Sequence, residues 1–121
     1  LTAHLLGCPG PIQAFDIGPD CGPAMNELIA MNADVLQGAQ PFHGFVGTLE
    51  SPEVKGPYQG LLANILLITI QELLPRMAEL TAPGGYLVAS GILATQEDEA
   101  LISLVGAGFK PEKVLHDRSW V

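Results

Sequence analysis

The sequence predicts an α/β domain with a mostly parallel sheet that helices cover. In the stretch from Leu61 to Leu93, a short apolar run, an amphipathic segment, a Pro-Gly-Gly break and a second apolar run follow one another. Strand, helix, turn and strand in this order make a βαβ unit, which joins two parallel strands. The same alternation of short apolar runs and helical patterns continues on both sides of this stretch, which favours the α/β class.

The βαβ unit has well-marked boundaries. Its first strand is the run LLANI at 61–65, which is too short for a helix and is polar only at Asn64. Apolar side chains then recur at helical spacing on one face, until the break at Pro83–Gly85 ends the helix. The second strand is YLVAS at 86–90. The expected apolar face of the helix comprises Leu66, Ile70, Leu73, Leu74, Met77 and Leu80.

The first third of the chain shows weaker patterns. Its strand at 11–17 ends on Asp16 and runs into a turn. Asn32 falls on the apolar face of the next helix, so we expect it to hydrogen-bond at the sheet edge. The predicted elements are the end of a helix at 1–7, a strand at 11–17, a helix at 23–37, a strand at 42–47 and a polar loop at 48–59.

The last third predicts one more helix and one more strand. The helix covers 95–105, with Thr95 as its N-cap and the acids of 97–99 in the first turn, where the helix dipole favours negative charge. The segment 109–115 is expected to be a strand. Trp120 and Val121 are expected to start one more element, which is cut off almost at once.

Composition limits the classes of function. At 121 residues, 48% hydrophobic and 15% charged, the chain is at most one domain and has enough apolar content for a core. No run approaches the roughly 18 apolar residues of a membrane span. The net charge of −8 disfavours nucleic acid as a direct partner and suits a basic protein. Two cysteines without metal-ligand spacing predict neither a disulfide framework nor a metal site, and favour a cytoplasmic location.

Polar or small residues close the predicted strands. They share the carboxyl edge of a parallel sheet, where such folds bind ligands. The carboxylate of Asp16 could accept two hydrogen bonds from a ribose diol there, and it could equally cap a helix or a turn. Ser90 lacks a His or Asp placed to activate it as a nucleophile. The strand-tip residues are Asp16, Gly47, Thr48, Asn64, Ser90 and Gly91.

Four segments together resemble a known family. They are LLANIL, APGGYLVASGIL, TQEDEALISLVGAGFKPEKV and the final SWV. Over roughly Ile12 to Val121 the sequence resembles the class I methyltransferases that use S-adenosylmethionine. Within that class it is most similar to the family that methylates ribosomal large-subunit protein eleven. The resemblance implies a Rossmann-like fold and methyl transfer to amino groups of a basic ribosomal protein.

The resemblance also implies roles for particular residues. Asp16 would hold the ribose hydroxyls of the cofactor, and the segment 47–49 would lie beside its adenine. Asn64 would be catalytic, at the point where the methyl donor meets the acceptor amine; alternatively, it only ties down a loop at a strand end. The residues assigned to the cofactor are Asp16, Ile17, Gly47, Thr48, Leu49 and Asn64.

The sequence departs from the family pattern in three places. The glycine-rich first strand and loop that hold the methionine part of the cofactor are missing, and so is the last strand. Gly18 stands where the family has a second acid. We therefore expect 1–121 to be a single, truncated catalytic domain, and the missing loop argues against activity of this chain alone.

Two other functions remain open. The chain could be a non-catalytic α/β module that binds a protein partner through exposed sheet edges. It could also be a nicotinamide-dinucleotide domain, which requires a Gly-x-Gly-x-x-Gly turn about 20 residues before the ribose-binding acid. The GCPGP run at 7–11 is a poor substitute, because it precedes a strand. The sequence indicates no oligomeric state.

Overall fold

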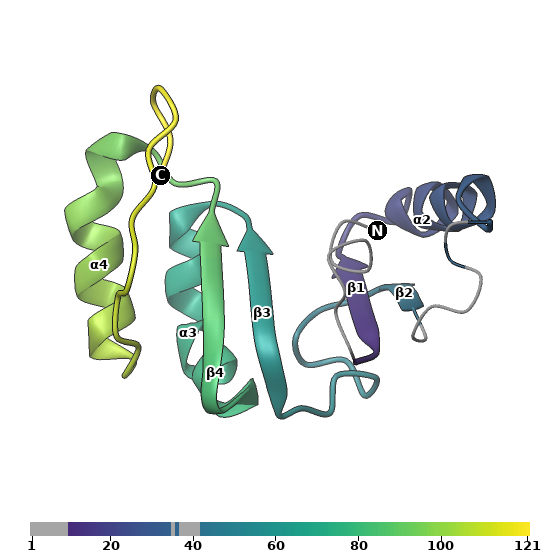
Figure 1. Ribbon diagram of the computed structural model, residues 1–121, viewed down its shortest axis with the longest axis horizontal. Helices are drawn as coiled ribbons and strands as arrows, with labels where there is room; N and C mark the ends of the chain where they lie inside the picture. Colours follow the sequence, from purple (N-terminus) through teal and green to yellow (C-terminus); the bar gives the residue numbers. More distant parts are fainter. Residues whose placement is uncertain (1–9, 35, 37–41) are drawn as a thin grey trace. The chain divides into compact units, whose positions relative to one another are not determined.

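A computed structural model describes residues 10–34, 36 and 42–121 (Figure 1). The chain divides into two compact units, 1–51 and 52–121. The helix end predicted at 1–7 lies outside the described residues. Among the described residues, no helix has the length and apolar character needed to cross a membrane.

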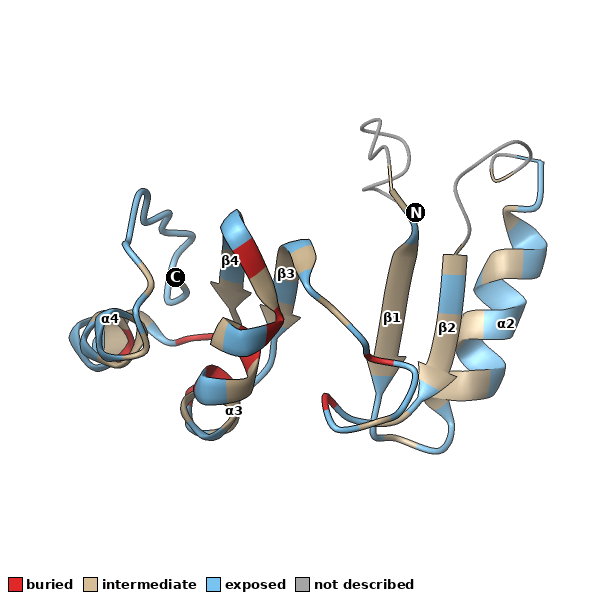
Figure 2. Cartoon of the chain, turned by 90° about the horizontal axis from the view of Figure 1, so that it is seen from below, coloured by how far each residue is buried: buried red, intermediate tan, exposed pale blue. Residues whose placement is uncertain are grey.

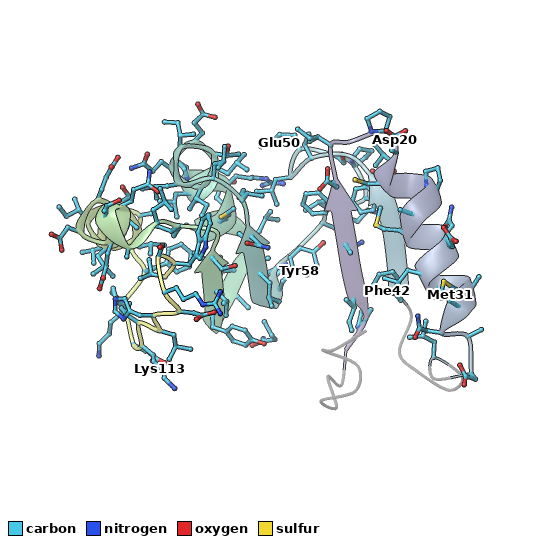
Figure 3. The ribbon with its side chains drawn as sticks, turned by 90° about the horizontal axis from the view of Figure 1, so that it is seen from above. Asp20, Met31, Phe42, Glu50, Tyr58 and Lys113 are labelled. Atoms are coloured by element: carbon cyan, nitrogen blue, oxygen red, sulfur yellow. The ribbon has the colours of Figure 1, made fainter. Side chains whose placement is uncertain are left out.

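The described part of the first unit contains two parallel strands and one helix. Strand β1 covers Ile12–Asp16, helix α2 covers Cys21–Met31 and strand β2 covers Phe42–Val46. The two strands pair in parallel along their whole length, and the rings of Phe15 and Phe45 stack with centroids 5.2 Å apart. Figure 3 labels Met31 and Phe42, where α2 ends and β2 begins. The strand–helix–strand order predicted here is confirmed.

Helix α2 is shorter than the predicted helix at 23–37. It ends at Met31, and Asn32 follows as its C-cap residue. The side-chain amide of Asn32 donates to the backbone carbonyl of Leu28 at 2.8 Å. The expected hydrogen bond to the sheet edge is therefore wrong. The short polar side chain finds an acceptor on its own helix, which is the local competition that makes Asn common at helix ends.

The second unit contains the predicted βαβ unit. Strand β3 covers Tyr58–Asn64, helix α3 covers Leu67–Leu80 and strand β4 covers Thr81–Ser90. The strands are parallel, and Asn64 pairs with Ser90 at their carboxyl ends. The Pro83–Gly85 stretch lies inside β4, where the pairing register shifts. The second strand thus begins earlier than predicted.

The hydrophobic core of the second unit forms around α3. The assignment of Leu66 to the apolar face of this helix is wrong, because Leu66 precedes the helix and is 69% exposed. Leu67 takes the buried position instead, and the rest of the apolar face follows the helical period toward β4. Figure 2 shows the buried residues, in red, on α3, β4 and α4. The core cluster comprises Leu67, Ile70, Leu74, Ile92 and Ala100.

Shortening Ile70 tests this core. Ile70 is 1% exposed, so Ile70→Val should lower the free energy of unfolding by about 1 kcal/mol, as loss of one buried methylene does. Ile102→Val is the matched control, because Ile102 also lies in a helix but is 73% exposed. Urea unfolding followed by circular dichroism measures both variants. Equal midpoints would contradict the assignment of Ile70 to the core.

The helix predicted at 95–105 begins with a 3₁₀ turn at Ala94–Gln96 and continues as α4, Glu97–Gly106. Thr95 lies inside that turn, so its prediction as N-cap is wrong. The side chain of Gln96 accepts a hydrogen bond from the Leu93 N–H at 3.1 Å. The longer amide side chain reaches back to the N-cap residue of the turn, as the second half of a capping box does.

The strand predicted at 109–115 is wrong. The described chain has no strand there, and Pro111 has no N–H to donate to a ladder. The chain instead returns along the residues after β4, where the Val121 N–H donates to the Ile92 carbonyl at 2.9 Å. Trp120, where a further element was expected, forms isolated antiparallel bridges with Leu93 and Asp117.

Candidate functional site

The carboxyl ends of β3 and β4 open into a cleft of about 660 Å³. Asn64 and Ser90 lie side by side there because the two strands are parallel and in register. The Ser90 hydroxyl donates to Asn64 Oδ1 at 3.2 Å. Gly91 lines the cleft next to this pair. The C-terminal segment after α4 contributes Leu115 and Trp120 to the lining. The cleft therefore combines a polar amide with apolar side chains.

Close approach at this edge requires glycine at position 91. Gly91 has φ +80°, and a Cβ there would lie 3.0 Å from both Asn64 Oδ1 and the Ile65 carbonyl oxygen. A side chain would therefore strain the backbone and push against the Asn64 amide. The backbone at Gly91, just after β4, thus lies close to the Asn64 side chain.

The tail that forms the other wall is fixed to α4. His116 Nε2 lies 2.7 Å from Glu97 Oε2, and Glu97 is in the first turn of α4. Leu115 and Trp120, on either side of this contact in sequence, are 67% and 50% exposed. Sequence reasoning missed this wall. Its only signals in the sequence are Leu115, at the end of the segment predicted as a strand, and Trp120, where a further element is predicted.

In the first unit, Asp16 ends β1 and its carboxylate is exposed. Its Oδ1 accepts a hydrogen bond from the Gly18 N–H at 2.8 Å, which is a local turn contact. Ile17, between them, is 77% exposed. The acid at this strand tip thus organises its own turn and faces solvent.

The segment 47–49 lies beside Asp16. The Gly47 N–H donates to the Asp16 carbonyl at 2.9 Å, and the Thr48 N–H donates to Ser51 Oγ at 2.9 Å. Leu49 is buried, at 7% exposure. The structure therefore brings five of the predicted cofactor residues together at one strand edge of the first unit, and places Asn64 in the second unit.

Cys21 is a neighbour of Asp16 that sequence reasoning did not connect with the site. Partial burial raises the pKa of the Cys21 thiol, and a hydrogen bond with Asp16 and the negative charges of Asp16 and Asp20 raise it further. A thiol in this environment stays protonated near neutral pH and is a poor nucleophile. Within the described residues, no group of three or more His, Cys, Asp or Glu could hold a metal ion.

Comparison with known proteins identifies relatives over most of the chain. The family model "Ribosomal protein L11 methyltransferase (PrmA)" matches residues 2–121. The ribosomal protein L11 methyltransferase of Geotalea uraniireducens is 36% identical over 109 residues, which are 90% of this chain and 33% of that protein. That of Brucella suis is 40% identical over 65 residues, 54% of this chain and 23% of the relative. The chain thus spans a third or less of these relatives.

A solved structure supports the fold. The ribosomal protein L11 methylase of Lactobacillus delbrueckii subsp. bulgaricus superposes with a TM-score of 0.81 at 24% identity, covering 98% of this chain and 57% of that one. This likeness confirms the α/β, Rossmann-like fold predicted from the sequence. Because the family model covers almost every residue, the chain belongs to the ribosomal protein L11 methyltransferase family.

Proposed function

We propose that this chain is part of the catalytic domain of an S-adenosylmethionine-dependent N-methyltransferase that acts on amino groups of a ribosomal protein. The chain spans only part of its relatives, so the activity of the whole protein belongs to this proposal. The observation that carries it is the Asn64–Ser90 pair at the mouth of an open cleft. Family membership supplies the reaction class, and this pair supplies a place for the acceptor amine.

The cofactor residues fit the group that the family implies. Asp16 presents an exposed carboxylate at a strand tip, which suits the two hydroxyls of a ribose. The neighbouring segment 47–49 is held to Asp16 by a backbone hydrogen bond and could lie along the adenine. Asp16, Ile17, Gly47, Thr48 and Leu49 would bind S-adenosylmethionine in this proposal, together with Asn64.

Asn64 would orient the acceptor. S-adenosylmethionine, held by the residues named above, would supply a methyl group to the nitrogen of the neutral amine, and its sulfur would leave with the electron pair of the broken sulfur–carbon bond. Asn64 Oδ1 can accept an N–H of the neutral amine, which directs the nitrogen lone pair away from the amide. Alignment of this kind supplies a large part of the rate of a two-reactant step. The apolar side chains of Leu115 and Trp120 would limit water around the amine.

The charge of the chain supports a basic substrate. Its net charge is −8, three consecutive acids occupy the first turn of α4, and Asp117 lines the cleft. A field of this sign attracts a lysine-rich protein and repels nucleic acid. A ribosomal protein substrate would also place the reaction in the cytoplasm.

Transfer of a labelled methyl group tests the function. We expect a protein of the full length of its relatives that contains this chain to label a basic large-subunit ribosomal protein from methyl-tritiated S-adenosylmethionine. The label should be recovered as N-methylated amino groups after acid hydrolysis. An acidic protein of similar size is the control acceptor. Absence of label from a protein that binds S-adenosylhomocysteine would contradict transfer to this substrate.

One feature favours a second function, a non-catalytic module for protein binding. The face of β3 and β4 opposite the core carries Leu62, Tyr86 and Val88, which are 75%, 59% and 48% exposed. An apolar patch of this kind often marks an interaction surface. Binding of S-adenosylhomocysteine without any methyl transfer would favour this alternative.

A further inference from the structure

We propose that Ser90 is a positioning residue that holds the Asn64 amide in the orientation needed to receive the acceptor amine. The inference rests on the proposed function, because it assigns Ser90 a task only if Asn64 contacts the amine. Nothing in the sequence pattern distinguishes Ser90 from an ordinary residue at a strand end. The structure does, through one hydrogen bond and one glycine.

The hydrogen bond sets which way the amide faces. Asn64 Oδ1 can only accept, so at 3.2 Å the Ser90 hydroxyl must be the donor. The amide oxygen and nitrogen have nearly the same shape, but only the oxygen can accept this hydrogen bond. The contact therefore favours the orientation in which Oδ1 faces Ser90. A carbonyl oxygen has two lone pairs, and Ser90 occupies one of them. The second is left to accept an N–H from an amine in the cleft.

Without Ser90, little in the strand itself would hold the amide. Asn64 is the last residue of β3 and is exposed, and the terminal torsion of an asparagine side chain is broad. Ser90 is its direct cross-strand partner in the parallel ladder, so both side chains project from the same face. The strand pairing therefore aligns the two groups before any ligand arrives.

Gly91 leaves the space that the Asn64 amide oxygen needs. A Cβ at this position would lie 3.0 Å from Asn64 Oδ1, closer than an ordinary contact. Because glycine has no Cβ, the oxygen can lie beside the backbone at the end of β4 and accept the hydrogen bond from Ser90. Ser90 therefore directs the amide, and Gly91 allows it to come this close.

A matched pair of substitutions isolates the hydroxyl. Ser90→Thr and Ser90→Val give β-branched side chains of almost the same shape, and only threonine can donate. We expect Ser90→Val to lower kcat about five- to tenfold, which is the effect of losing one neutral hydrogen bond. KM for S-adenosylmethionine should stay unchanged, and Ser90→Thr should restore most of kcat. Equal kcat in both variants would overturn the inference.

A second measurement judges the positioning independently of catalysis. The side-chain amide of Asn64 gives its own pair of nitrogen-15 resonances, and their relaxation reports how ordered the group is. We expect lower order in Ser90→Val than in Ser90→Thr, in the chain without ligands. Equal order would overturn the inference even in an active enzyme. If order falls as expected but the unsubstituted full-length protein transfers no methyl group, the proposed function fails while the positioning stands.

Discussion

Asn64→Ala is expected to reduce kcat for methyl transfer about a hundredfold or more, the loss that follows when a reacting group is no longer aligned. Asn64 Oδ1 faces the cleft at the carboxyl end of β3 and is held by Ser90. Alanine removes the proposed acceptor of the amine N–H and leaves the sheet pairing intact. Binding of S-adenosylhomocysteine should change much less than turnover, because the residue proposed to hold the ribose hydroxyls is Asp16. Steady-state kinetics on the full-length protein and calorimetric titration separate the two effects.

A control on the same strand separates chemistry from folding. Gln59 also lies in β3 and carries an exposed amide, but it is at the opposite end of the strand from the cleft. Gln59→Ala should leave kcat within about twofold of the unsubstituted protein. If Asn64→Ala behaves like Gln59→Ala, the assignment of Asn64 to the acceptor amine is wrong.

Asp16→Ala is expected to raise the Kd for S-adenosylhomocysteine about a hundredfold, since hydrogen bonds to a charged group contribute about 1.5–3 kcal/mol each. Alanine removes the carboxylate proposed to hold both ribose hydroxyls. It also removes the acceptor of the Gly18 N–H, which loosens the turn after β1. Turnover at saturating cofactor should fall less than affinity, opposite to the pattern for Asn64→Ala.

Asp20→Ala is the matched control for Asp16. Asp20 lies in the same turn, at the start of α2 (Figure 3), and its side chain makes no capping hydrogen bond. The two variants therefore lose the same charge, and only one loses the proposed ribose contact. Isothermal titration calorimetry with S-adenosylhomocysteine measures both. Similar Kd values for the two variants would refute the role of Asp16.

The βαβ unit could be predicted from the sequence because local pattern and tertiary environment agree there. Ile70 and Leu74 recur at helical spacing and are buried as that spacing requires. The apolar run before Asn64 is a strand that pairs with β4. The position of the candidate site could also be predicted, because parallel strands bring Asn64 and Ser90 to the same edge of the sheet.

The errors concern residues whose conformation depends on distant partners. The segment 109–115 has strand-like composition. A strand forms only when a neighbouring strand supplies hydrogen bonds, and the structure shows no strand pairing at 109–115. The Leu115 and Trp120 wall of the cleft depends on the path of that tail, which sequence periodicity does not encode. Thr95 is not the N-cap because the 3₁₀ turn begins before it, at Ala94.

The two units differ in how much apolar surface they remove from water, and this has a thermodynamic consequence for cofactor binding. Helix α2 has no buried residue, and Leu49 is the only hydrophobic residue of the core among the described part of 1–51. Regions with few buried apolar contacts open at lower free energy than the rest of a protein. A ligand that binds only the ordered form has an apparent affinity reduced by the ordered fraction. Cofactor affinity would then measure the local stability of the turn around Asp16 as well as the contacts made by its carboxylate.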